Sequence, residues 1–171
     1  MNCEKRIVLT GFMGVGKSSV ARHLAYLLRC EKIDLDNLIE GSEHRKIAEI
    51  IDADGEAIFR RIETENLKRA LNKTNVRILS LGGGTWTQAE NRELIRQHGM
   101  TTIWLESNFS HCWNNIRFSW KDRPLARNKR SAQKLFDARQ ELYCLADWHF
   151  IVKPDHTSFD VARQIAEEVF S

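Results

Sequence analysis

The sequence predicts an α/β fold, in which helices flank a parallel β-sheet. Short apolar runs alternate along the chain with longer segments whose apolar residues recur at helical spacing. A glycine-rich loop joins the first apolar run to the first helical segment. The composition, 42% hydrophobic and 29% charged with only two prolines, is typical of globular proteins without disordered linkers. We therefore expect residues 1–171 to form a single domain around one core.

The first half of the chain is expected to contain three strands and three helices. Apolar runs predict the strands, and segments with an apolar residue at every third or fourth position predict the helices. We expect strands at Ile7 to Thr10, Lys32 to Leu35 and Val76 to Leu81, and helices at Ser18 to Arg29, near Lys46 to Ile51, and at Asp54 to Asn72 with Asp54 as the N-cap.

The second half continues this alternation. We expect strands at Thr101 to Leu105 and Trp148 to Val152, and helices at Gln88 to Gln97, from Ser107 or Asn108 onward, at Ala132 to Leu145 and at Phe159 to Phe170. Right-handed crossovers between such strands produce a parallel sheet that is covered on both faces. Ligands of these sheets bind beyond the carboxyl ends of the strands.

Charge and cysteine content argue against several classes of protein. The net charge is only +3 and the basic residues are scattered, so neither nucleic acid nor a membrane surface is an expected partner. The cysteines Cys3, Cys30, Cys112 and Cys144 form no CxxC pair, which predicts reduced thiols rather than a zinc site or a disulfide framework. The apolar run Ile7 to Leu9 is too short for a signal peptide or membrane span, so we expect a cytoplasmic protein.

A phosphate-binding motif lies between the first predicted strand and the first predicted helix. Gly11 to Ser18, GFMGVGKS, matches the pattern G-x-x-x-x-G-K-[ST] of the P-loop. Its glycines let backbone N–H groups turn toward a polyphosphate, and the following helix adds the positive end of its dipole. Lys17 is expected to reach the β- and γ-phosphates, and the Ser18 hydroxyl to bind Mg²⁺. The predicted nucleotide-binding residues of this loop are Gly14, Val15, Gly16, Lys17, Ser18 and Ser19.

Two aspartates, Asp34 and Asp36, end the second predicted strand. Alternation along an extended chain directs both carboxylates to the same side. One of them can bind the metal ion, directly or through water, while the other holds a hydroxyl or accepts its proton. A second interpretation stays open, in which the aspartates cap the next helix.

Further short motifs follow in order along the chain. They are Phe59-Arg60 in a predicted helix, Gly82-Gly83-Gly84 after a strand, Arg123-Pro124-Leu125 in a polar stretch, and Arg139 within ARQELY. Together with the P-loop and the Asp-x-Asp pair, these motifs resemble the shikimate kinase family over nearly the whole chain.

The resemblance implies a nucleoside-monophosphate-kinase-like fold with five parallel strands in the order 2-3-1-4-5, flanking helices and a lid. It implies transfer of the γ-phosphoryl group of ATP, with Mg²⁺, to the 3-hydroxyl of shikimate, a step of aromatic amino acid biosynthesis. The substrate-binding region is expected at about residues 33–61 and the lid at about residues 112–127. We expect a monomer.

The resemblance also implies roles for individual residues. Arg60 and Arg139 bind the shikimate carboxylate, for which the guanidinium fork is suited. Asp36 binds the ring hydroxyls, either as a base or to orient the attacking oxygen. The three glycines, Gly82, Gly83 and Gly84, let the main chain approach the ring. Asp34 joins Ser18 at the metal ion.

The lid carries the arginine that the resemblance places at the transferring phosphoryl group. This is Arg123, which with Lys17 and Asp36 completes the expected catalytic set. Arg117 occupies the position of an arginine near the adenine, and the segment from Lys153 to Thr157 is expected beside it. The remaining basic residues of the lid, including Lys121, are expected to be solvated charges.

Three departures and two alternatives remain. Ala126 replaces a common leucine, Glu141 a frequent proline, and Thr85-Trp86 a small residue after the glycines. Trp86 is expected to be a packing aromatic, although an indole near the pocket would narrow it.

A gluconate-type kinase is an alternative function, since gluconate also offers a carboxylate and hydroxyls. The other alternative is a nucleotide-binding relative that has lost phosphoryl transfer.

Overall fold

The computed structural model describes residues 4–171, and Cys3 lies outside them. Within this range five parallel strands form one sheet in the order β2-β3-β1-β4-β5, which confirms the predicted order. The strands are β1 (Ile7–Thr10), β2 (Glu31–Asp34), β3 (Val76–Ser80), β4 (Thr101–Glu106) and β5 (Trp148–Ile151).

The helices agree with the sequence except between residues 35 and 56. They are α1 (Lys17–Leu28), α2 (Leu35–Glu43), α3 (Ile47–Asp54), α4 (Glu56–Asn72), α5 (Ala89–Gln97), α6 (Phe109–Arg117), α7 (Lys129–Tyr143) and α8 (Ser158–Val169), with short 3₁₀ turns η1 (Thr85–Thr87) and η2 (Pro124–Ala126). The sequence did not predict α2. The expectation that Asp54 caps α4 was wrong, because Asp54 ends α3 and Gly55, at φ 89°, lies between the two helices.

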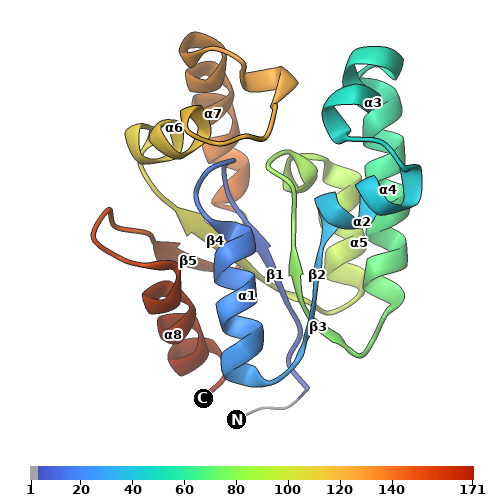
Figure 1. Ribbon diagram of the computed structural model, residues 1–171. Helices are drawn as coiled ribbons and strands as arrows, with labels where there is room; N and C mark the ends of the chain where they lie inside the picture. Colours follow the sequence, from blue (N-terminus) through green and yellow to red (C-terminus); the bar gives the residue numbers. More distant parts are fainter. Residues whose placement is uncertain (1–3) are drawn as a thin grey trace.

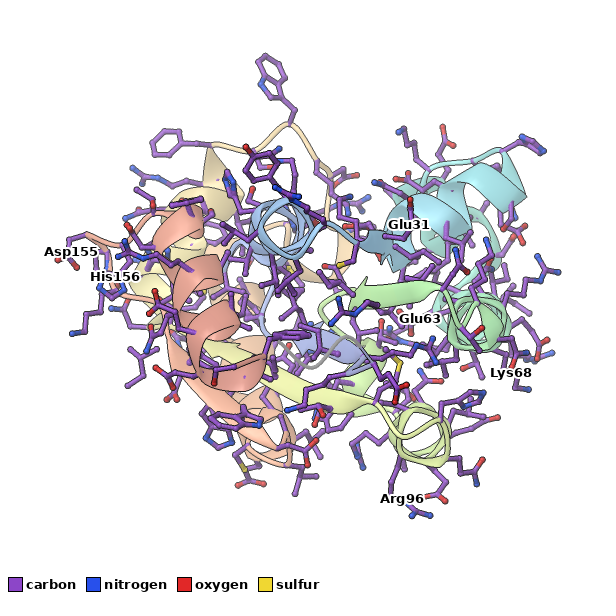
Figure 2. The ribbon with its side chains drawn as sticks, turned by 90° about the horizontal axis from the view of Figure 1, so that it is seen from below. Glu31, Glu63, Lys68, Arg96, Asp155 and His156 are labelled. Atoms are coloured by element: carbon purple, nitrogen blue, oxygen red, sulfur yellow. The ribbon has the colours of Figure 1, made fainter. Side chains whose placement is uncertain are left out.

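The helices cover both faces of the sheet. Helices α1 and α8 lie side by side on one face (Figure 1). Helices α5 and α7 lie on the other face, as the view from below shows (Figure 2). Helix α7 packs on β4 through the rings of Tyr143 and Trp104, whose centroids are 6.0 Å apart. Because both faces are covered, the residues Ile7, Val8 and Leu9 of β1 are all completely buried.

The parallel sheet brings three functional segments to one edge. In the strand register, Ser80 of β3 lies opposite both Leu9 of β1 and Asp34 of β2. The carboxyl ends of these strands are therefore neighbours. The loops that leave them, which are the P-loop, the Asp34 turn and the triple glycine, share one end of the molecule.

The part of the chain that the structure describes contains neither a membrane-spanning helix nor a cluster of metal-ligating side chains. No helix of residues 4–171 has the length and apolar character needed to cross a bilayer. Cys30, Cys112 and Cys144 are free thiols, and within the same range no three or more His, Cys, Asp or Glu side chains gather as a metal site.

The packing of α8 on α1 is expected to contribute strongly to stability. Ile165 of α8 is completely buried, so Ile165→Ala should lower the free energy of unfolding by about 2–5 kcal/mol, measured by urea denaturation. Arg163→Ala, on the exposed side of the same helix, is the matched control and should change it by about 0.5 kcal/mol or less. Equal losses for the two variants would contradict this account of the core.

Candidate active site

A cavity of about 570 Å³ lies at the carboxyl ends of the strands. It is lined by the P-loop, by residues of α2, α3 and α4, by the triple glycine and by the lid. All of the predicted site residues except Arg117 line it: Gly14, Val15, Gly16, Lys17, Ser18, Ser19, Asp34, Asp36, Arg60, Gly82, Gly83, Gly84, Arg123 and Arg139. The fold thus brings together side chains that are spread over 126 positions of the sequence, since Gly14 and Arg139 are both among them.

The P-loop has the backbone geometry that its glycines predict. Gly14 has φ 82°, and a Cβ added there would lie 2.6 Å from the carbonyl oxygen of Cys112. Gly16, at φ 103°, is the N-cap of α1 and provides no side-chain cap. The first N–H groups of α1 therefore remain available at the positive end of the helix dipole, where an anion is stabilised.

Lys17 is held inside the loop that it follows. Its side chain is only 8% exposed, and Nζ donates to the carbonyl oxygens of Gly11 (2.7 Å) and Phe12 (3.0 Å). Burial lowers the pKa of Lys17 to about 8, and the negative charge of Asp36 partly opposes this shift. Added phosphate groups would favour the charged ammonium.

Ser18 and Asp34 form a pair of oxygen donors. Ser18 Oγ donates to Asp34 Oδ2 at 2.5 Å, and Asp34 Oδ1 accepts from the backbone N–H of Asn37 at 3.1 Å. Asp34 is therefore the N-cap of α2 and a partner of the P-loop at once. A hydroxyl and a carboxylate are suited to Mg²⁺, which prefers hard oxygen ligands.

The expected placement of Asp36 on a strand was wrong. Strand β2 ends at Asp34, and Asp36 lies in the first turn of α2, because the Asp34 cap starts the helix immediately. The carboxylate still faces the cavity, where its Oδ2 accepts from Lys121 Nζ at 2.8 Å. Lys121 is thus an ion-pair partner inside the site rather than a purely solvated charge.

Glu63 is a site residue that the sequence reasoning missed. It is 1% exposed, and its carboxylate pairs with Arg60 Nη1 (2.8 Å) and accepts from Thr85 Oγ1 (2.8 Å). Burial raises the pKa of Glu63, while the charge of Arg60 opposes the rise. In Figure 2 the side chain of Glu63, a residue of α4, points toward β3, whereas Lys68 of the same helix points outward. The signal in the sequence was its i,i+3 spacing from Arg60.

Two guanidinium groups each have a buried N–H donor without an acceptor. Within residues 4–171, Arg139 Nη1 and Arg60 Nε are buried and make no hydrogen bond. Arg139 is 6% exposed, and its Nη1 lies 3.3 Å from where a Cβ on Gly83 would be. A Cβ on Gly84 would overlap the Arg60 guanidinium. The triple glycine therefore makes room for these cations, whose free donors suit an anionic ligand.

Of the two arginines of the predicted lid that were assigned a role, one lies in the cavity and the other outside it. Arg123 lines the cavity, and burial lowers its pKa while Asp36 opposes the shift. Arg117 does not line the cavity, because its guanidinium lies over the Phe118 ring, 4.5 Å from the centroid. A role for Arg117 at the adenine stays a prediction.

Four side chains that were not predicted individually also line the cavity. His156 and Thr157, from the expected adenine-side loop, line the cavity together with His111 and Asn115 of α6. Asn115 Nδ2 donates to the carbonyl oxygen of Gly14 at 2.7 Å, which connects α6 to the P-loop. Figure 2 shows His156 on the far side of the molecule from Glu63, so the cavity extends between these two regions.

Trp86 is a packing residue. It is 5% exposed, does not line the cavity, and donates its indole N–H to the carbonyl oxygen of Leu142 at 2.8 Å. The indole therefore does not narrow the pocket.

The chain is a P-loop kinase by its fold and site. The P-loop at the end of β1 shares one cavity with the buried Lys17, the Asp-x-Asp pair and Arg123. The family model for shikimate kinase matches residues 13–170. The chain belongs to the shikimate kinase family, as its motifs indicate.

Individual relatives agree with this assignment. The chain is 37% identical to the shikimate kinase of Lactococcus lactis subsp. cremoris, over 95% of this chain and 96% of the relative. It is 39% identical to that of Streptococcus thermophilus, over 92% and 96%. The structure of the Acinetobacter baumannii shikimate kinase in complex with shikimate is 31% identical, with a TM-score of 0.89 over 97% of this chain and 93% of that one.

Titration of Lys17 should couple nucleotide binding to proton uptake. The ligand-free pKa of about 8 means that Lys17 is largely neutral at about pH 9, whereas bound phosphates favour the ammonium. Calorimetry of MgADP binding at about pH 9, in buffers of different ionisation enthalpy, should detect uptake of close to one proton. Uptake should be small at about pH 7, where Lys17 is already charged, and Lys17→Arg should abolish the difference between the two pH values.

Proposed function

We propose that this protein catalyses phosphorylation of the 3-hydroxyl of shikimate by ATP, giving shikimate 3-phosphate and ADP. The observation that carries the proposal is the pair of guanidinium groups of Arg60 and Arg139, which line the cavity that also holds the P-loop and each have a buried N–H donor without an acceptor. A carboxylate is the ligand that satisfies such donors, and shikimate has one carboxylate. A relative of 31% identity is in complex with shikimate.

The nucleotide is bound by the P-loop. Backbone N–H groups of residues 14–19 surround the phosphates, and Lys17 exchanges its carbonyl partners for phosphate oxygens. Ser18 and Asp34 would hold Mg²⁺, directly or through water. A bound Mg²⁺ would supply positive charge to the phosphate groups, and Asp34 fixes the Ser18 hydroxyl by accepting its hydrogen bond.

The acceptor is bound by residues of the substrate-binding region, about residues 33–61, and by the triple glycine. Arg60 and Arg139 bind the carboxylate, while Glu63 keeps the Arg60 guanidinium in place. Asp36 accepts hydrogen bonds from ring hydroxyls, and Gly82 to Gly84 leave space for the ring.

The lid, about residues 112–127, completes the site for transfer. Lys17 and Arg123 stabilise the charge on the transferring phosphoryl group from two directions, and Asp36 orients the attacking hydroxyl. A loose transition state needs little proton abstraction, so orientation is the main contribution of Asp36. Closure of the lid excludes water, which would otherwise accept the phosphoryl group. A monomeric state and a cytoplasmic location stay predictions.

The alternative acceptor, gluconate, is less well supported. A gluconokinase from Sinorhizobium meliloti shares the fold at a TM-score of 0.55 and 15% identity, which bears on the fold alone. The other alternative, a relative without activity, does not account for Lys17, Asp36 and Arg123 converging on one cavity.

Acceptor specificity is tested by ADP release from MgATP with shikimate, with gluconate and without acceptor. We expect a rate with shikimate at least about a hundredfold above both other rates, because unsatisfied buried donors reject a ligand that fits them poorly. Equal rates with and without shikimate would contradict the proposed function. A higher rate with gluconate would favour the alternative acceptor.

Arg60→Ala should raise the dissociation constant for shikimate by about 30-fold or more, since it removes a charged donor from a side chain that is only 15% exposed. MgADP affinity should stay within about twofold, because Arg60 is outside the P-loop. Arg60→Lys keeps a cation beside Glu63 but loses the planar fork, and should still weaken shikimate binding. Arg61→Ala, an exposed neighbour on α4, is the control for both titrations. Parallel loss of shikimate and MgADP affinity would contradict the carboxylate assignment.

A further inference from the structure

A lysine of the lid contacts the acceptor-binding carboxylate. Lys121 Nζ lies 2.8 Å from Asp36 Oδ2, although the two residues are 85 positions apart. Both side chains line the cavity. The family resemblance assigned no role to Lys121, so this contact is an additional feature of the site.

The Asp36 carboxylate is constrained from two directions. Its Oδ1 lies against Gly82, where an added Cβ would be 2.7 Å away, and its Oδ2 accepts from Lys121. The carboxylate also lies in the first turn of α2, where the helix dipole stabilises a negative charge. A carboxylate has about four acceptor positions, so a ligand hydroxyl can still bind to the oxygens that Lys121 and Gly82 hold in place.

Lys121 also supports the lid arginine. Arg123 Nη1 donates to the carbonyl oxygen of Lys121 at 3.2 Å. An ammonium that is fixed on Asp36 therefore fixes the backbone to which Arg123 is hydrogen-bonded. The lid has a second connection to the acceptor side, from Arg127 to Asp52 of α3 at 2.6 Å, but both of these side chains are about half exposed and such pairs contribute little.

We propose that Lys121 is a positioning residue for phosphoryl transfer. Its ammonium orients Asp36 toward the acceptor hydroxyl, and the same contact couples lid closure to the acceptor site, so that Arg123 faces the phosphoryl group. This inference rests on the proposed function, because it assigns Asp36 to the acceptor.

The kinetic test replaces Lys121 with methionine, which is similar in length and uncharged. We expect kcat to fall and KM for shikimate to rise, each by about tenfold, while KM for MgATP stays within about twofold. Lys121→Arg retains a cation and should recover most of the loss. Lys134→Met, at an exposed position of α7 outside the cavity, is the control and should behave as the wild type.

A double-mutant cycle tests whether Lys121 acts through Asp36. Shikimate affinity is measured by calorimetry in the presence of MgADP, for Lys121→Met in the wild-type and Asp36→Asn backgrounds. Lys121→Met should raise the dissociation constant for shikimate about tenfold in the wild-type background, and about twofold or less when Asp36 is already changed. Wild-type kinetics for Lys121→Met, or equal effects in both backgrounds, would overturn the inference. If the wild-type protein releases no ADP in response to shikimate, the proposed function fails and this inference with it.

Discussion

Repulsion between cations is the constraint on which the organisation of this site depends. Five cationic side chains line the same cavity: Lys17, Arg60, Lys121, Arg123 and Arg139. The charges of Lys121 and Arg123 both disfavour the charged form of Lys17, in addition to its burial. Four carboxylates line the cavity as well, those of Asp34, Asp36, Glu63 and Asp122. They reduce the repulsion, most directly where Asp36 pairs with Lys121 and Glu63 with Arg60. The positive charge that remains in excess attracts anionic ligands.

A buried polar network supports the carboxylate that is least accessible. Behind Glu63, Thr85 donates to its Oε2, and Asn91 Nδ2 donates to the carbonyl oxygen of Thr85 at 3.0 Å. Asn91 in turn accepts from Thr64 at 2.8 Å. Each of these polar groups is buried with a hydrogen-bond partner, so their burial does not carry the desolvation cost of unpaired groups, and the bonds hold Glu63 in place. The Thr85 that distinguishes this chain after its triple glycine thus helps to orient Arg60 through Glu63.

The features that the sequence predicted are those with local causes. The strands follow from short apolar runs, and the P-loop follows from eight consecutive residues between a strand and a helix. Asp36 was placed on a strand because the alternation of an extended chain was continued past Asp34. In the structure Asp34 ends the strand and caps α2, so Asp36 is helical. Lys121 was taken as solvated because its partner is 85 positions away, and no local pattern marks such a pair. Arg117 was assigned from its place in the family motif although its spacing to Arg123 is slightly short, and its guanidinium lies over the Phe118 ring outside the cavity.

The carboxyl end of α7 is fastened to the acceptor loop by two hydrogen bonds of different origin. Trp86 donates to Leu142, and Tyr143 donates its hydroxyl proton to the carbonyl oxygen of Gly83. The amino end of α7 begins at Lys129, directly after the lid. Arg139 lies on the half of α7 that these two hydrogen bonds hold against the acceptor loop, whereas the lid continues into the other half. The position of Arg139 beside Gly83 is therefore set by the acceptor loop, and the lid contacts the acceptor side elsewhere, through Lys121 and Arg127.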